Sequence, residues 1–174
     1  MLAAGHSGAG YHRDMPYFLK IEGIAGESTD AKHKGEIEVE SFSWGVSQSA
    51  SPSPGGGGGG AGKASFDDLH VVTPFSAAGP RLFEACATGR HLPSAVLTGR
   101  RGGGKAQFEF ITLTLSDVLV RAYRSGAPSA EVVPSDEFSL ACSKLQIEHK
   151  AQSPTGAPGA ATVAGFDIAR NQKL

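Results

Sequence analysis

The residues that come nearest to a nucleotide-binding motif lie in the glycine run SPSPGGGGGGAGKAS, positions 51–65. Gly57 to Lys63 reads G-x-x-x-x-G-K, the beginning of a P-loop, in which backbone amides and a lysine hold phosphates. The motif also requires a Ser or Thr hydroxyl for magnesium directly after the lysine, and Ala64 stands there. The polar segment SQSASPSP precedes the run where a buried apolar strand belongs, and no helical pattern follows it. We therefore interpret the run as a loop and not as a nucleotide site.

The other reactive side chains form no recognisable catalytic or metal-binding pattern. None of the six histidines makes an H-x-H or H-x-x-x-H pair, and neither Cys86 nor Cys142 belongs to a C-x-x-C pair. Asp67 and Asp68 are adjacent, so on a strand their side chains would point to opposite faces and could not share a metal or a proton. The sequence contains no G-x-S-x-G elbow. It therefore predicts no enzyme, metal or cofactor, and leaves open whether the two cysteines pair.

The composition excludes further classes of protein. The 16 basic and 17 acidic side chains nearly balance, whereas a protein that binds nucleic acid needs a basic surplus on at least one face. No apolar run approaches roughly eighteen residues, so no membrane insertion is expected. Residues 1–14 lack the apolar segment of a secretory signal, and we expect a disordered tail or an added extension there. Residues 15–174 have the length of a single domain.

Most of the chain alternates apolar and polar residues with the period of two that is typical of β-strands. This pattern predicts strands at residues 17–24, 35–45, 63–75, 94–101, 106–126, 136–150 and 162–170. A helix is predicted at residues 79–89, because Leu82, Phe83 and Cys86 form a narrow apolar stripe and Gly89 suits a C-terminal stop. The predicted fold is mainly β: a compact barrel of two packed antiparallel sheets with one flanking α-helix.

Three of the predicted strands change phase, which means that their apolar side chains move from one face to the other. The change follows Val39 in the first, falls near Phe110 in the second and follows Cys142 in the third. Near Phe110 a β-bulge is the simplest explanation. After Val39 we expect either a bulge or one long strand whose two faces change environment.

Four short motifs, GIAGES, SWGVSQS, GGAGKAS and ACATGRH, occur in this order within residues 18–49, 55–69 and 82–120. In these stretches the chain resembles the Hcp family, the haemolysin-coregulated proteins of bacterial type VI secretion. The resemblance covers essentially the whole chain from Met15. It departs from the family in the first fourteen residues and in the SASPSP entry to the glycine loop.

The resemblance implies a structural protein. Members of the family form hexameric rings with a wide central channel, and the rings stack into a tube that a contractile sheath expels behind a VgrG-type spike. The implied partners are other copies of the chain, the spike, the sheath proteins and effector proteins carried in the lumen. The protein would be cytoplasmic before firing and would then be secreted without a signal peptide. The alternative is a monomeric β-barrel ligand-binding module with the glycine loop as its lid.

The resemblance also assigns roles to particular residues. The loop at residues 50–62 would be an extended arm that contacts neighbouring subunits or the adjoining ring. The residues of this assembly loop are Gly55, Gly56, Gly57, Gly58, Gly59, Gly60, Gly62 and Lys63. Ser41 and Ser43 would face the lumen and its cargo, with Phe42 and Trp44 buried behind them.

Overall fold

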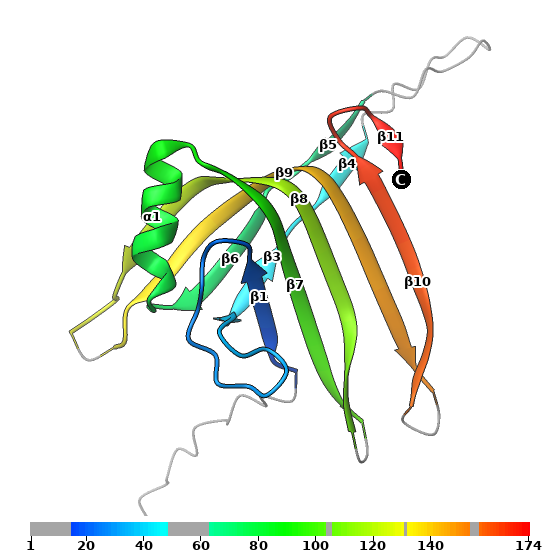
Figure 1. Ribbon diagram of the computed structural model, residues 1–174, viewed down its shortest axis with the longest axis horizontal. Coiled ribbons are helices and arrows are strands. Elements are labelled where there is room, and N and C mark those ends of the chain that lie inside the picture. Colours follow the sequence, from blue (N-terminus) through cyan, green and yellow to red (C-terminus); the bar gives the residue numbers. More distant parts are fainter. Residues whose placement is uncertain (1–14, 49–62, 104–105, 131, 154–156) are drawn as a thin grey trace, which may run out of the picture.

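The computed structural model describes residues 15–48, 63–103, 106–130, 132–153 and 157–174, which form eleven strands and one helix (Figure 1). In chain order the elements are β1 (Tyr17–Ile21), β2 (Ile37–Val39), β3 (Ser41–Ser43), β4 (Val46–Gln48), β5 (Ala64–Phe66), β6 (Leu69–Pro74), α1 (Ala78–Thr88), β7 (His91–Gly103), β8 (Ala106–Gly126), β9 (Ser135–Gln152), β10 (Pro158–Asp167) and β11 (Gln172–Lys173). The prediction of a mainly β fold with one helix is confirmed. The number of strands exceeds the seven predicted segments, partly because the segments at 35–45 and 63–75 are each interrupted.

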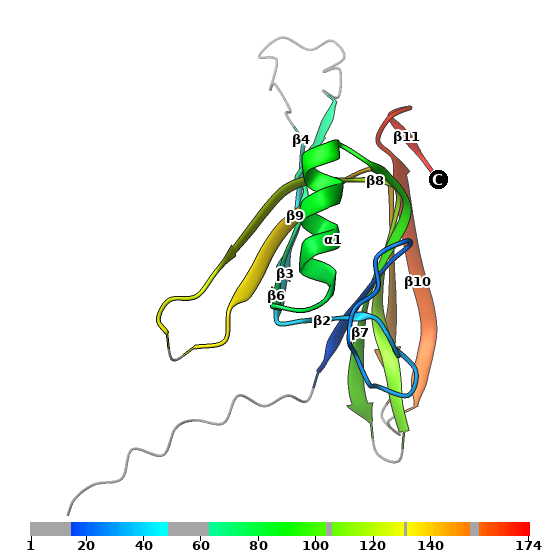
Figure 2. The ribbon, with the colours of Figure 1, turned by 60° about the vertical axis from the view of Figure 1, so that its left-hand side comes forward.

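All of the described strand pairs are antiparallel. The main sheet runs in the order β11-β10-β9-β8-β7-β1-β2, β3 and β6 branch from it, and β4 and β5 form a separate two-stranded sheet. The branch exists because β9 changes partner: residues 135–140 pair with β6, whereas most of β9 from residue 144 onward pairs with β10. The sheet therefore separates into two layers, which Figure 2 shows from the side.

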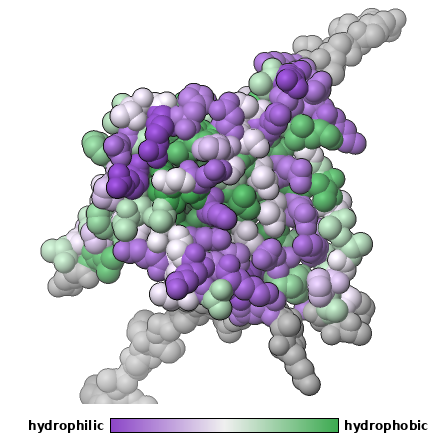
Figure 3. All heavy atoms as spheres, viewed as in Figure 1, coloured by the Kyte–Doolittle hydropathy of each residue, from purple (hydrophilic) through white to green (hydrophobic). Residues whose placement is uncertain are grey.

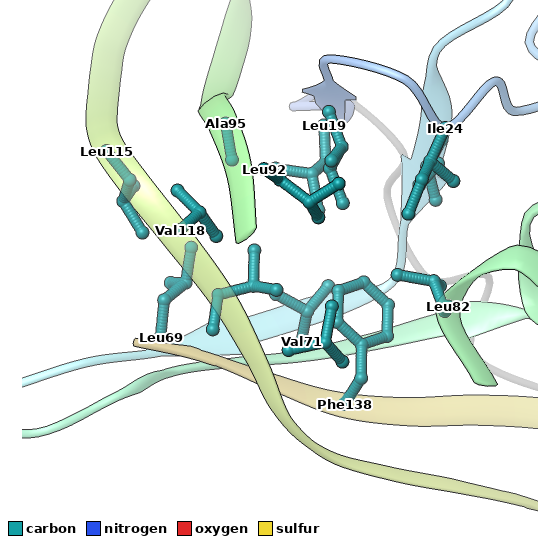
Figure 4. Close-up of a cluster of buried hydrophobic side chains, with 14 of the residues drawn as sticks. Leu19, Ile24, Leu69, Val71, Leu82, Leu92, Ala95, Leu115, Val118 and Phe138 are labelled. Atoms are coloured by element: carbon teal, nitrogen blue, oxygen red, sulfur yellow. The ribbon is translucent and has the colours of Figure 1, made fainter. Parts of the chain in front are cut away.

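The hydrophobic core lies between the two layers, where β1, β6, β7, β8 and β9 all contribute side chains. Leu19, Leu97 and Leu113 are completely buried. Helix α1 closes one side of the core and places Leu82 and Ala85 into it, as Figure 4 shows for Leu82. The helix thus fixes the two layers relative to each other on this side.

The helix begins and ends one residue before the predicted limits. It ends because Gly89 adopts the left-handed conformation, φ 62°, and donates its N–H to the carbonyls of Ala85 and Cys86. The predicted apolar stripe is wrong at one position. Leu82 is fully buried, but Phe83 is 60% exposed. The small residues Ala78 and Ala85 complete the buried face, which leaves Phe83 on the outer side.

The phase change after Val39 is neither a bulge nor one long strand. Strand β2 ends at Val39 and pairs with β1, whereas β3 begins at Ser41 and pairs with β6 in the branch of the sheet. Glu40 and Ser41 are both exposed, so the alternation restarts there. The chain passes from one layer to the other at this point, and each layer buries its own face.

The bulge predicted near Phe110 is confirmed. Gly99 of β7 pairs with Ile111 of β8, and the next residue, Arg100, pairs with Glu109. Phe110 is therefore the extra residue of the bulge.

The phase change after Cys142 is shared by two neighbouring strands. On β8 the buried residues Leu115 and Val118 are three positions apart, so the buried face changes between them. Asp117, directly before Val118, has a φ of 53°. The Asp117 carboxylate accepts hydrogen bonds from the Ser143 hydroxyl of β9 and lies 2.7 Å from the His91 Nδ1 of β7. These contacts, led by the Ser143 hydroxyl, lower the pKa of Asp117. We call the row of Asp117 and Ser143 the corner, because the buried face of both strands changes side here.

Candidate functional site

Strand β3 presents the two serines as the sequence predicts, with alternating exposure. Ser41 and Ser43 are exposed, while Phe42 and Trp44 are half-buried and pack against the core. The Phe42 ring meets the edge of Tyr17, with ring centroids 5.1 Å apart. The aromatic side chains thus anchor β3 and turn its serines outward. That the exposed side lines a channel stays a prediction.

An open groove of about 410 Å³ lies beside Ser43, and we call it the Ser43 groove. It is lined by Ser43, Trp44, Phe66, Asp67, Asp68, His70 and Arg121. A narrower cavity of about 120 Å³ shares five of these residues and reaches between the layers to Leu113, Leu140 and Cys142. The groove therefore has a polar mouth and an apolar end.

The mouth of the Ser43 groove contains one ion pair and a second carboxylate. Arg121 Nε lies 3.4 Å from Asp68 Oδ2; the Asp68 side chain is mostly buried and that of Arg121 is mostly exposed. Asp67 is exposed, and its N–H donates to the Gly45 carbonyl at 2.9 Å. The prediction that Asp67 and Asp68 point to opposite faces of a strand is wrong, because they lie between β5 and β6 and both line this groove.

Sequence reasoning missed Arg121 as a groove residue. Val120 pairs with Leu140 and Ala122 pairs with Ser139, so Arg121 is the extra residue of a second bulge on β8. A bulge redirects the side chain of the residue that it adds, which aims Arg121 at Asp68. No local sequence signal marks this bulge, because the charged and small residues around Arg121 also fit an ordinary exposed strand.

The groove residues do not form a metal centre or an activated nucleophile. In the described part of the chain, no group of three or more His, Cys, Asp or Glu side chains is placed to hold a metal ion. Burial, assisted by the nearby Asp68 carboxylate, raises the pKa of Cys142 to about 11, so its thiol stays protonated at neutral pH. Cys86 and Cys142 are both free thiols. The arrangement can bind a polar group, but Cys142 is a poor nucleophile.

A second polar cluster holds the loop between β1 and β2 onto the outer face of the main sheet. The buried Arg100 guanidinium donates to the Asp30 carboxylate and to the side-chain carbonyl of Gln107. The backbone N–H of Lys32 and the Arg100 guanidinium lower the pKa of Asp30. The loop is thus fastened by a charge-assisted contact to a residue far away in sequence.

Aromatic stacking and a close backbone approach complete the attachment of this loop. The His33 ring stacks on Phe18 with centroids 4.4 Å apart, and His33 Nδ1 lies 2.9 Å from Glu36 Oε2. In the GIAGES motif, a Cβ added to Gly26 would lie 2.3 Å from the Glu36 carbonyl oxygen. The second glycine of this motif is therefore required by the packing of two backbone segments.

The predicted assembly loop can be followed only at its end. Lys63 is exposed and lies directly before β5. The glycines from Gly55 to Gly62 lie outside the described residues, so their role as an assembly arm stays a prediction. Within the described ranges, no helix is long and apolar enough to cross a membrane.

Comparison with known proteins identifies the class to which this fold belongs. The family model described as "Type VI secretion system effector, Hcp" matches residues 18–149. The chain is 41% identical over 155 residues to Protein hcp1 of Pseudomonas aeruginosa, covering 88% of this chain and 95% of that protein. These matches define a type VI secretion system protein.

Solved structures agree with this classification. The crystal structure of Hcp1 from Salmonella typhimurium superposes with a TM-score of 0.76 at 32% identity, covering 92% of this chain and 99% of the other. A structure described as a type six secretion system protein gives a TM-score of 0.86 at 26% identity, with the same coverage. The chain belongs to the Hcp family, and the resemblance read from its motifs is confirmed.

Proposed function

We propose that this chain is a structural tube subunit of a type VI secretion system, which forms hexameric rings that stack into the expelled inner tube. The observation that carries the proposal is the similarity to hcp1, which extends over 95% of that protein. The proposed partners are further copies of the chain, a VgrG-type spike, contractile sheath proteins and effectors held noncovalently in the lumen. The protein would be cytoplasmic before firing and secreted afterwards, without any catalytic step of its own.

The decisive experiment is the mass of the purified protein in solution, measured by mass photometry and compared with electron micrographs. A six-subunit ring is expected. A stable monomer at micromolar concentration would reject the tube subunit and favour the alternative, a monomeric ligand-binding module.

We propose further that Ser41 and Ser43 face the lumen, where Ser43 contacts cargo. The exposure of both serines and the open groove that Ser43 lines support this assignment. Ser43→Gln should leave rings intact but change the amount of effector that copurifies with them. Ser47→Gln on β4 is the matched control, since Ser47 is also exposed but does not line the groove. Unfolding of Ser43→Gln would reject the lumen assignment.

The glycine loop at residues 50–62, with Lys63 at its end, is proposed as the arm that joins neighbouring subunits or rings. Glycine permits backbone conformations and close approaches that other residues forbid, and ordering a loose arm on assembly costs part of the binding energy. Amides of this loop should exchange hydrogen faster in isolated rings than in stacked tubes. Equal protection in both states would contradict the proposed role.

A further inference from the structure

The first group of exposed apolar side chains comes from α1, from the segment just before it and from the connection between β8 and β9, and we call this group the helix-side patch. It consists of Phe75, Phe83, Val132 and Val133, with exposed fractions of 49%, 60%, 49% and 72%. The Phe75 N–H donates to the Pro134 carbonyl, which brings Phe75 next to the two valines. Phe83 meets the edge of Tyr123 at 6.3 Å. These contacts join Phe75 to the segment that leads into β9 and Phe83 to β8.

The second surface lies on the last long strand, and we call it the β10-side patch. Val163 is 52% exposed and Leu174 is 53% exposed. Between them lies Gly165, where an added Cβ would be 3.1 Å from the Leu174 side chain. Leu174 therefore lies over Gly165, two residues along β10 from Val163.

The outer edge of β10 is open along most of its length. One edge pairs with β9, while on the other edge only Phe166 and Asp167 pair with a described strand, β11. No charged residue occurs from Pro158 to Phe166. Soluble proteins usually protect an exposed edge with charges, bulges or a covering element. A long uncharged edge of this kind is suited to contact with another chain.

The two patches lie at opposite ends of the molecule. Figure 1 shows α1 and the β8–β9 connection at one end of the longest axis and β10 with β11 at the other. In the same view, Figure 3 shows apolar residues at both ends. One protomer cannot cover one patch with the other. A second copy of the chain carries the same two patches, so its β10-side patch can cover the helix-side patch of the first copy.

We propose that the helix-side patch of one protomer binds the β10-side patch of the next copy, head to tail. Contact between two different patches repeats from subunit to subunit and closes into a ring when the rotation allows it, whereas contact between identical patches stops at a dimer. The side chains that define the patches are all uncharged. Charged side chains border both patches: Glu84 follows Phe83 on α1, and Glu148 of β9 pairs with Val163. The inference rests on the proposed function and names the surfaces that the ring requires.

The test uses one charged substitution in each patch, Phe83→Arg and Val163→Arg. Both side chains are more than half exposed, so both variants should fold, which circular dichroism checks. The control is Val46→Arg, because Val46 on β4 is 53% exposed and lies in neither patch. By mass photometry, the wild type and the control should be rings, and both patch variants should be monomers.

Mixing the two patch variants tests which surfaces meet. Phe83→Arg keeps its β10-side patch and Val163→Arg keeps its helix-side patch, so the mixture should form a dimer of one copy each and nothing larger. A ring in either patch variant, a dimer of one variant alone, or no mixed dimer would overturn the inference. A wild type that is itself monomeric would instead reject the proposed function, so the two failures are distinguishable.

Discussion

Leu82 and Phe83 are neighbours on α1, but the structure assigns them opposite roles. Leu82 is completely buried between the two layers, while Phe83 is 60% exposed in the helix-side patch. We predict that Leu82→Ala destabilises the fold and leaves the assembly surface in place. Phe83→Ala should weaken assembly and leave the stability of the protomer almost unchanged.

The expected magnitudes follow from burial. Removing a fully buried leucine side chain costs the transfer free energy of the lost groups and leaves a cavity, together about 3–5 kcal/mol. An exposed substitution changes the free energy of unfolding by about 0.5 kcal/mol or less. For a chain of this length, each kcal/mol lowers the melting temperature by about 2–4 °C. Leu82→Ala should therefore melt at least about 6 °C lower, and Phe83→Ala within about 2 °C of the wild type.

Urea unfolding can follow the fluorescence of Trp44, which is the only tryptophan in the chain and packs against the core. Both substitutions are compared in the Val163→Arg background, which is expected to be monomeric, because association adds to apparent stability and Phe83→Ala should also weaken assembly. Equal losses of unfolding free energy in Leu82→Ala and Phe83→Ala would refute the distinction between a buried and an exposed face. A Leu82→Ala loss below about 1 kcal/mol would refute the role of the helix in closing the core.

Two further predictions concern the loop between β1 and β2. Gly26→Ala should lower the free energy of unfolding by about 1–3 kcal/mol, because its Cβ would collide with backbone atoms of Glu36 that no rotamer change can move. Gly126→Ala, where no atom lies within 4 Å, is the control, and equal urea midpoints for the two would contradict the packing argument. The folded-state pKa of Asp30 lies below its ordinary value of 3.8, so its stabilising contribution is present above pH 3.8 and is lost as the pH falls from there through the lower folded-state pKa. Asp30→Asn should therefore unfold at lower urea than the wild type at pH 7, and the difference should shrink below about pH 4; a difference independent of pH would contradict the assignment.

The sequence predicts the elements of this fold better than their connections. The helix and the bulge at Phe110 follow from local patterns, because spacing within one segment reports which side chains share a face. The break after Val39 could not be predicted in the same way. In the sequence, the shift of apolar residues from one face to the other is the same whether a strand contains a bulge or ends and continues in another layer. Only the pairing of β2 with β1 and of β3 with β6 distinguishes the two cases.

The exposure of Phe83 illustrates a related limit. Leu82 and Phe83 both fit an apolar stripe, and the alanines that complete the buried face are too small to mark it in the sequence. The Ser43 groove was beyond prediction for a different reason. Asp68 and Arg121 meet only because β6 and β8 both border β9, and because a bulge aims Arg121 at Asp68.

The corner at Asp117 and Ser143 connects the fold to the proposed assembly. The helix-side patch is attached to one side of the corner, where Tyr123 of β8 contacts Phe83 and donates to Asp136 of β9. The β10-side patch is attached to the other side, where β10 pairs with β9 from Lys144 onward. Because β8 and β9 run unbroken through the corner, its geometry fixes the angle between the two patches. In the proposed ring this angle sets the rotation from one subunit to the next, so the number of subunits depends on the strand geometry at the corner as well as on the two contact surfaces.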